Sequence, residues 1–187
     1  MNPIIKEKIK ESIDVKERIL ADEALLAKIE EAADAVRKAL LSGNKILLCG
    51  NGGSASDALH IAGEFVGRFQ KDRGAYPAIA LNADVASMTS IANDFGYDHV
   101  YERAVEGYGK SGDVLSGIST SGNSGNVCRA IDKAKDMGIT TIAFAGMSGG
   151  KMVDKADIAI VVPGDVTARI QEAHIMIGHI ICEIAEE

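Results

Sequence analysis

Two pairs of side chains in this sequence have the types and spacing needed for acid–base or metal chemistry. His60 and Glu64 are four residues apart, which makes them neighbours on one face of a helix. A carboxylate beside an imidazole can move protons near neutral pH, because an ordinary histidine titrates in that range. Such pairs are also common on solvated helix faces, so the spacing alone does not establish catalysis.

The second pair, Gln171 and His179, lies eight residues apart, roughly 12 Å along a helix. Both side chains reach one ion from one helix only in strained poses, because metal ligands must approach to about 2.0–2.2 Å. If both serve one site, we expect a neighbouring protomer to supply one of them. Glu64 would then face a partner subunit's imidazole. His174 lies nearer the apolar stripe of the same helix, and we expect it to be packed in the core.

The helix that carries His60 and Glu64 also has an apolar stripe. We expect its core face to consist of Leu59, Ala62, Val66 and Phe69. At about 100° per residue, His60 and Glu64 then lie off that face.

Two loops rich in glycine and serine precede helices and resemble anion sites. The first contains Asn51, Gly52 and Gly53, followed by Ser54 and Asp57 at the spacing of a capping box. The second offers four hydroxyl groups, from Ser119, Thr120, Ser121 and Ser124. A helix N-terminus after a glycine loop binds phosphate through amide donors and the helix dipole, without Lys or Arg. Either loop alone is equally well explained as an ordinary capped turn, but the two together favour a phosphate monoester ligand.

Two other nucleotide-binding loops compete with this interpretation. No Gly-Lys-Ser/Thr follows the glycines, which excludes a Walker loop. A dinucleotide fingerprint fits Gly50, Gly52 and Ala55, with Asp84 as the ribose ligand, although Asp84 is further away than the usual ~20 residues. That alternative also leaves the serine loop without a role.

The surrounding elements alternate between short apolar runs and helical stretches. The expected strands are Lys45–Cys49, Pro77–Leu81, Asp113–Ile118, Ile139–Phe144 and Ile158–Val162. The expected helices are 55–69, 84–93, 97–107, 125–137, 149–154 and 167–184. This order predicts an α/β fold, a three-layer sandwich with a five-stranded parallel sheet. Both loops then follow the carboxyl ends of strands, where open α/β sheets bind ligands.

Two helical segments come before the first strand. One covers Lys6 to Leu20, and the other has apolar residues at Leu25, Ile29 and Val36. We expect residues 1–42 to form a helical extension that packs in an oligomer, and residues 43–187 to form the ligand-binding domain.

The composition excludes several classes of protein. Among 187 residues, 20 Lys and Arg stand against 27 Asp and Glu, which gives a net charge of −7. This charge argues against a nucleic-acid or membrane-surface partner. No apolar run approaches the ~20 residues of a membrane helix. Cys49, Cys128 and Cys182 have no metal-binding spacing, so we expect reduced thiols and a cytoplasmic protein.

Four separated motifs, GNGGSASDALHIAGEFVGR, SIANDFGYD, GISTSGNSGNV and TARIQEAHIMIGHIICEI, together resemble the phosphoheptose isomerase family. The resemblance implies a sugar isomerase (SIS) fold in a homotetramer with active sites shared between subunits. It implies conversion of sedoheptulose 7-phosphate into D-glycero-D-manno-heptose 7-phosphate. This is the first step toward the activated heptoses of lipopolysaccharide and other surface glycans.

The resemblance also implies roles for individual residues. Glu64 and His179 match the catalytic pair, and His60, Glu64, Gln171 and His179 match a zinc site. Substrate contacts are implied for Asn51, Gly52, Gly53, Glu64, Asn93, Asp94, Ser119, Thr120, Ser121, Ser124 and Gln171. The spacing of Asn93 and Asp94 alone does not separate a sugar-hydroxyl clamp from a helix-end turn.

An alternative from another functional class is a non-catalytic SIS-fold protein that binds phosphosugars or acts as a DnaA-associating adaptor. Loss of the acid–base pair distinguishes such relatives. This chain has both Glu64 and His179, which favours the enzyme.

Overall fold

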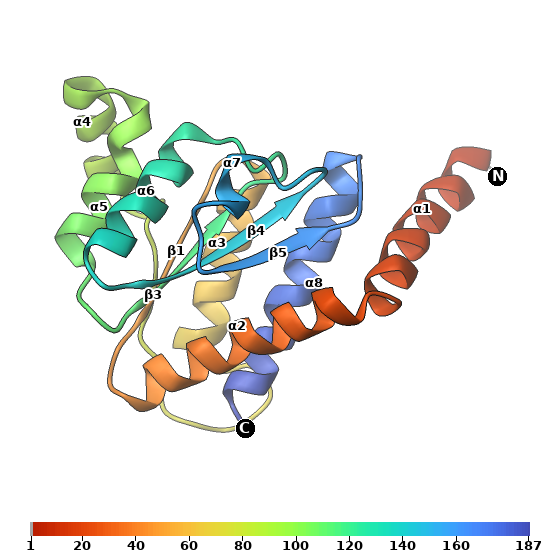
Figure 1. The fold of residues 1–187 in the computed structure, drawn as a ribbon, viewed down its shortest axis with the longest axis horizontal. Coiled ribbons are helices and arrows are strands. Elements are labelled where there is room, and N and C mark those ends of the chain that lie inside the picture. Colours follow the sequence, from red (N-terminus) through yellow and green to blue (C-terminus); the bar gives the residue numbers. More distant parts are fainter. Residues whose placement is uncertain (1) are drawn as a thin grey trace.

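The computed structural model describes residues 2–187, and residues 2–50 form two helices followed by the first strand. Helix α1 covers Pro3–Leu20 and begins where the Asn2 side chain accepts a hydrogen bond from the Ile4 amide. Helix α2 covers Glu23–Leu41 and is capped in the same way by Asp22. In Figure 1, α1 projects away from the rest of the molecule, whereas α2 lies along it.

The remaining chain alternates strands with helices, as the sequence predicts. The strands are β1 (Ile46–Gly50), β2 (Ala78–Ala80), β3 (Val114–Ile118), β4 (Thr140–Gly146) and β5 (Ile158–Val162). The helices are α3 (Gly53–Val66), α4 (Val85–Phe95), α5 (Val100–Tyr108), α6 (Gly125–Asp136), α7 (Gly150–Val153) and α8 (Thr167–Ala185). A 3-10 turn, Tyr97–His99, lies between α4 and α5.

The five strands form one parallel sheet in the order β2-β1-β3-β4-β5, which confirms the predicted fold class. From β1 the chain first extends the sheet toward β2, and then crosses to β3 on the other side of β1. This reversal places the loops after β1 and β3 side by side at the carboxyl edge of the sheet. Ligands of open α/β sheets bind at such a switch point.

Helices cover both faces of the sheet, and alternate side chains of β1 point to opposite faces. Ile46 and Leu48 belong to the core on the face covered by α2, α3 and α8, to which α1 adds two residues. Leu47 and Cys49 belong to the core on the other face, together with residues of α5, α6 and α7. Helix α2 therefore shares its core with the sheet. In contrast, α4 has no buried residue and only rests on its neighbours through partly buried side chains.

The core face of α3 differs from the prediction. Its buried apolar residues are Ala58, Ile61, Ala62 and Phe65. Leu59 and Val66 are 47% and 49% exposed, so the predicted stripe was displaced by one residue. The sequence contains apolar residues on both faces of this helix, and periodicity alone does not tell which face meets the sheet.

Candidate active site

The loop after β1 turns directly into α3. Gly52 has φ +56°, a backbone conformation that favours glycine, and it is the N-cap of α3. The predicted capping box is wrong, because Ser54 lies inside the first turn and no side chain caps the helix. The amide groups at this end of α3 are therefore not satisfied by a capping side chain, which suits a bound anion.

The loop after β3 gathers its hydroxyl groups before α6. The Oγ of Ser119 lies 2.8 Å from that of Ser124 and 3.5 Å from that of Ser121. Ser124 is the N-cap of α6 but makes no capping bond to it. Three of the four predicted hydroxyl donors thus lie together at a helix N-terminus.

A pair of amide side chains joins the two loops. Asn51 and Asn126 exchange two hydrogen bonds of 2.9 Å, one in each direction. Tyr97 also donates to the Oδ1 of Asn51 at 2.9 Å. Because the amide of Asn51 is occupied in this way, the loop offers mainly its backbone to a ligand. Asn126 is 2% exposed, and no local sequence signal distinguishes it from the other residues of its loop.

Asn93 and Asp94 lie in the exposed last turn of α4, where the Asn93 amide donates to the Asp94 carboxylate at 2.8 Å. Tyr97, three residues beyond Asp94, ties the following segment to the first loop through Asn51. The side chains of Asn93 and Asp94 are open to solvent, and their role in binding sugar hydroxyls stays a prediction.

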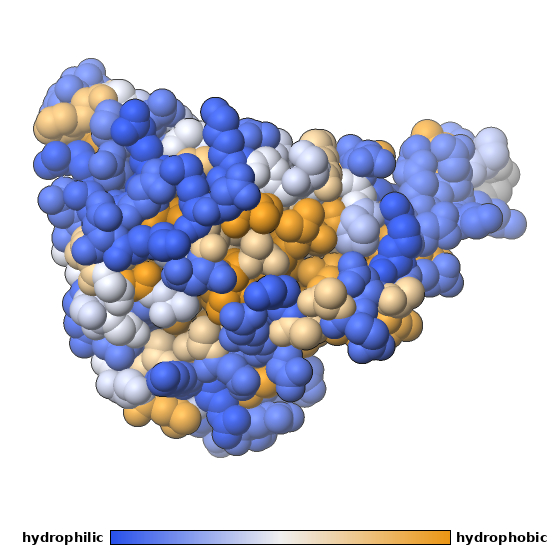
Figure 2. Space-filling view, viewed as in Figure 1, coloured by the Kyte–Doolittle hydropathy of each residue, from blue (hydrophilic) through white to orange (hydrophobic). Residues whose placement is uncertain are grey.

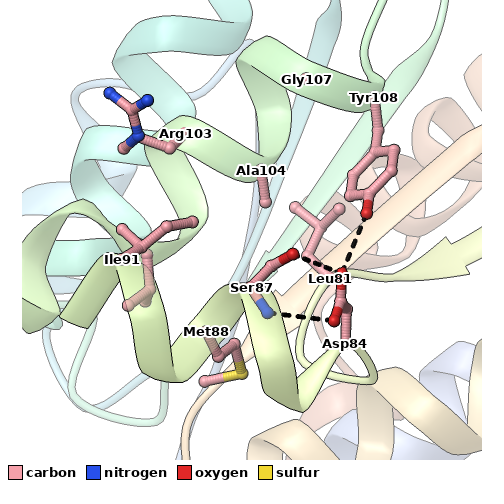
Figure 3. Close-up of a pocket in the computed structure, with 10 residues that line it drawn as sticks. Leu81, Asp84, Ser87, Met88, Ile91, Arg103, Ala104, Gly107 and Tyr108 are labelled. Carbon is pink, nitrogen blue, oxygen red and sulfur yellow. Dashed lines mark hydrogen bonds between the residues drawn. The ribbon is translucent and has the colours of Figure 1, made fainter. Parts of the chain in front are cut away.

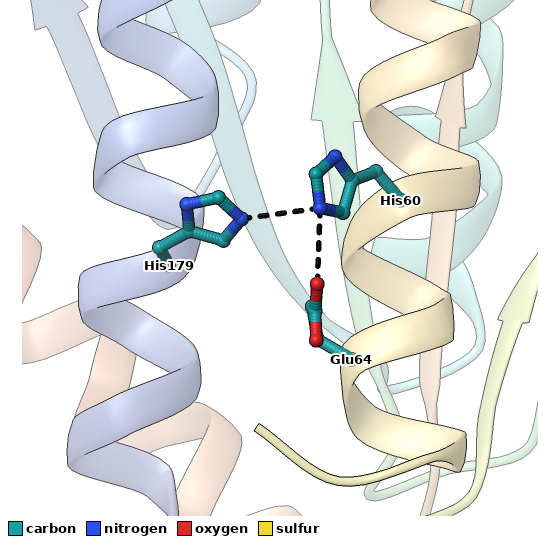
Figure 4. A group of neighbouring side chains, drawn as sticks. All are labelled: His60, Glu64 and His179. Atoms are coloured by element: carbon teal, nitrogen blue, oxygen red, sulfur yellow. Dashed lines mark hydrogen bonds and ion pairs between the residues drawn. The ribbon is translucent and has the colours of Figure 1, made fainter. Parts of the chain in front are cut away.

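His60, Glu64 and His179 of a single chain come together between α3 and α8, as Figure 4 shows. The Nε2 of His60 lies 3.0 Å from the Oε1 of Glu64 and 3.3 Å from the Nε2 of His179. The imidazole near Glu64 therefore comes from the same chain, and the expectation that a partner subunit supplies it was wrong. The expectation overlooked that α3 and α8 run side by side and bring His179 directly to His60.

The relative position of α3 and α8 depends on two close contacts. At Gly178, next to His179, a Cβ would lie 2.6 Å from the Cδ1 of Ile61, next to His60. At Gly53, a Cβ would overlap the side-chain amide of Gln171. The two helices therefore run parallel, with Gln171 at the loop end and His179 two turns further along.

The three clustered side chains have the types and spacing of a metal site. Tetrahedral zinc takes His nitrogen and carboxylate oxygen at about 2.0–2.2 Å, which puts neighbouring ligand atoms roughly 3.4 Å apart. One ligand atom from each residue lies within 4.8 Å of the other two. The residues therefore fit a divalent cation, whereas Gln171 lies against Gly53 instead of in this cluster.

Neighbouring groups complete the surroundings of the cluster. The Phe69 ring stacks on His179, with centroids 5.4 Å apart and planes at 19°. Burial raises the pKa of the Asp57 carboxyl, one turn before His60, and the charge of His60 opposes this shift.

His174 is buried as predicted, and one of its ring nitrogens lies 2.9 Å from the Ala145 carbonyl. Burial lowers the pKa of His174 to about 4.

A separate cavity of about 260 Å³ lies between α4 and α5 (Figure 3). Three of its polar side chains bond to one another, because Ser87 and Tyr108 both donate to Asp84. These bonds lower the pKa of Asp84, the N-cap of α4. A carboxylate engaged in this way does not suit the ribose contact that a dinucleotide site requires.

The fold and this site define the class of the protein. Residues 9–146 match the SIS domain family model. Among known proteins, the phosphoheptose isomerase of Clostridium acetobutylicum is 52% identical over 187 residues, which are 100% of this chain and 95% of that protein.

Two solved structures are similar along nearly the whole chain. The phosphoheptose isomerase of Neisseria gonorrhoeae is 39% identical, with a TM-score of 0.91 over 97% of this chain and 96% of that one. The phosphoheptose isomerase from Francisella tularensis is 36% identical, with a TM-score of 0.92 over 97% and 95% of the two chains. This protein belongs to the phosphoheptose isomerase family. It is a sugar-phosphate isomerase, and the adaptor alternative is not favoured.

Proposed function

We propose that this protein converts sedoheptulose 7-phosphate into D-glycero-D-manno-heptose 7-phosphate through an enediol. The observation that carries the proposal is the meeting of the Glu64 carboxylate and the His179 imidazole in one chain, within 4.8 Å. Membership of the phosphoheptose isomerase family supports the substrate class.

The reaction needs two proton transfers, and the two groups suit them. Glu64 removes a proton from C1 of the ketose and returns it to C2, while His179 moves a proton from the oxygen on C1 to the oxygen on C2. His60 lies 3.0 Å from one Glu64 oxygen, and this contact orients the carboxylate. The Glu64 side chain is 26% exposed, so substrate can reach it from solvent.

The proposed cofactor is Zn²⁺, held by His60, Glu64 and His179. The family resemblance implies Gln171 as a fourth ligand, and its side-chain amide, which lies against Gly53, would have to turn toward the cluster to bind the ion. When bound, the ion would polarise the carbonyl group and stabilise negative charge on the enediolate.

Equilibrium dialysis with Zn²⁺ tests the metal site. We expect the wild type to bind one ion per chain and His60→Ala to bind Zn²⁺ at least tenfold more weakly. Equal binding by both proteins would contradict it.

For the substrate, we propose that the phosphate binds the loop of Ser119, Thr120, Ser121 and Ser124, where the clustered hydroxyls and the N-terminus of α6 supply donors. Asn51, Gly52, Gly53 and Gln171 would contact the sugar from the first loop, with Asn51 acting through its backbone. Asn93 and Asp94 would bind sugar hydroxyls from the end of α4.

The proposed assembly is a homotetramer with active sites shared between subunits, in which residues 1–42 pack against a partner. Apolar side chains open to solvent support this proposal. Three isoleucines on one side of α1 are about half exposed, and Leu59 and Val66 of α3 are exposed beside the cluster of His60 and Glu64.

We place the reaction in the cytoplasm, as a step toward heptose precursors of lipopolysaccharide and related glycans, with no nucleic acid or membrane as partner. The acidic composition supports the absence of a nucleic-acid partner. Among residues 2–187, none of the helices is long and apolar enough to cross a membrane.

The proposed reaction is tested by incubating the protein with sedoheptulose 7-phosphate in D₂O. We expect the aldose product to carry deuterium at C2, because the proton on Glu64 exchanges with solvent. Glu64→Gln should lower kcat by about 10²–10⁴-fold, the usual contribution of a general base, while binding of inorganic phosphate stays unchanged. Glu183→Gln, an exposed glutamate of α8, is the control. Retention of more than about a tenth of the activity by Glu64→Gln would exclude Glu64 as the base.

A further inference from the structure

We propose that Glu186 is a positioning residue for this reaction, because its carboxylate fixes the turn that holds both His179 and the end of α3. The inference rests on the proposed function and extends it to a residue outside the substrate site. Glu186 follows α8 directly and lies seven residues beyond His179.

The Glu186 carboxylate is enclosed by the segment that leaves α3. Its two oxygens accept hydrogen bonds from the backbone amides of Phe69, Gln70 and Lys71, each at 2.9 Å. Arg73 adds a charged hydrogen bond from Nε at 2.7 Å. The Glu186 side chain is only 1% exposed. Three successive amides and a guanidinium around one buried carboxylate form a single rigid unit, which we call the Glu186 turn (residues 69–73 with Glu186).

One branch of the Glu186 turn leads to His179. Phe69 gives its amide to the Glu186 carboxylate, and its ring stacks on the His179 imidazole. Because the amide fixes the backbone from which the ring extends, the carboxylate determines the plane against which the imidazole packs. His179 also meets His60 edge-on through its Nε2, with ring centroids 4.9 Å apart and planes at 69°. The imidazole therefore contacts two rings, Phe69 on its face and His60 at its Nε2.

The other branch leads to Glu64. While its Nε binds Glu186, Arg73 donates to the backbone carbonyl of Glu64 at 3.1 Å and to that of Phe65 at 2.9 Å. These carbonyls belong to the last turn of α3, where no intrahelical donor is available. Arg73 thus caps the helix that carries Glu64, and Glu186 holds Arg73 in place.

The two branches converge on the acid–base pair and not on the phosphate loops. Gln171 marks the loop end of the α3–α8 pair, and the Glu186 turn lies at the opposite end. Loss of the Glu186 charge should therefore affect the chemical step more than binding of the phosphate group. A residue with a purely structural role would affect both or neither.

The test compares Glu186→Gln with the control Glu183→Gln, an exposed glutamate of the same helix. In the steady state, we expect Glu186→Gln to lower kcat by about 10–100-fold, as displacement of a reacting group by about 1 Å does. We expect KM and the inhibition constant of inorganic phosphate to change less than about twofold. The control should match the wild type. Equal kcat values for both variants would overturn the inference, and so would a loss confined to KM.

If Glu186→Gln does not fold, variants of Phe69 provide a second test of the inference. Phe69→Leu removes the stacked ring but keeps the amide bonded to Glu186, and we expect it to lower kcat while Phe69→Tyr, which keeps a ring, retains most of it. Wild-type kcat in Phe69→Leu would overturn the inference. If the wild type does not turn over sedoheptulose 7-phosphate, the proposed function fails instead, so the two failures are distinguishable.

Discussion

The Glu186 carboxylate combines deep burial with four hydrogen-bond donors, and this makes the stability of the protein depend on pH. Burial alone would raise the pKa of this carboxyl. The amides of Lys71, Phe69 and Gln70 together with Arg73 outweigh burial and lower the pKa from 4.5 to about 2. An unfolded chain binds a proton at this residue near pH 4.5, whereas the folded chain resists it. The stability from Glu186 is therefore complete above pH 4.5 and is lost as the pH falls toward 2.

We predict that Glu186→Gln melts several degrees below the wild type at pH 7 and that this gap narrows as the pH falls from 4.5 toward 2. Thermal unfolding followed by circular dichroism measures the gap. His174, with its pKa lowered to about 4 by burial, also destabilises the fold below pH 6.5. This effect acts equally on both proteins and cancels in the difference. A gap independent of pH would contradict the assigned charge state of Glu186.

Some contacts between residues can be predicted from their spacing in the sequence, and others cannot. His60 and Glu64 share a helix face by virtue of their spacing, and the structure places them in contact. Glu186 contacts Arg73 across 113 residues of sequence. Asn126 contacts Asn51, which lies 75 residues earlier in the sequence. Neither contact has a local signal, because each depends on which helix ends meet after folding.

At the scale of elements, the pairing of α3 with α8 depends on the absence of a side chain at Gly178. We predict that Gly178→Ala forces α8 away from Ile61, costs about 1–3 kcal/mol of stability as overpacking does, and lowers kcat by separating His179 from His60. Urea unfolding and steady-state kinetics measure the two effects.

Two variants make this prediction specific. Ile61→Val removes the methyl group that the new Cβ would meet, so the double variant should recover part of both losses. Gly63→Ala adds the same methyl group to α3 at a position with nothing within 4 Å and should be neutral or stabilising. Equal effects at Gly178 and Gly63 would show that helix packing is not the cause.

The elements themselves were largely predictable from sequence. All five strands and the helices between them lie within a few residues of the expected ranges, because short apolar runs between helical stretches are typical of a covered parallel sheet. The core face of α3 was not predictable. Leu59 and Val66 are apolar but exposed, and a chain that buries apolar surface against a partner has the same local pattern as one that buries it in its own core.

At the scale of the whole molecule, α1 extends from the body with an apolar side open to solvent (Figure 1). Ile5, Ile9 and Ile13 are 50%, 57% and 49% exposed, and their spacing of four residues aligns them along the helix. Figure 2 shows that apolar residues also reach the surface in the middle of one face, over β4 and β5. Exposed apolar surface of this extent supports assembly with further copies of the chain.

We predict that Ile9→Glu lowers the molecular mass in solution from four chains to one or two, because it places a charge in the interface proposed for α1. Size-exclusion chromatography with light scattering measures the mass. Lys10→Glu, which changes the charge of a neighbouring exposed residue on α1, should leave the mass unchanged. A wild type that is monomeric, or an unaltered mass for Ile9→Glu, would contradict the proposed assembly.

The strand order was the main global feature that sequence did not supply. The alternation of elements is compatible with several orders of five parallel strands. The observed order places the loops after β1 and β3 beside one another, so that Asn51 and Asn126 can pair. Two glycine loops therefore form one binding edge only through the topology of the whole sheet.

The parallel course of α3 and α8 has a consequence for selectivity between sugars. Gly53 and His60 are seven residues apart, so the loop end and the acid–base cluster are separated by about 10 Å along α3. The proposed phosphate loop lies beside Gly53, because Asn51 and Asn126 join the two loops. Under the proposed reaction, the substrate must therefore be long enough to leave its phosphate in that loop while C1 and C2 reach Glu64. A pentose phosphate anchored in the same loop would present the wrong carbons to the carboxylate, so chain length itself becomes a criterion for turnover.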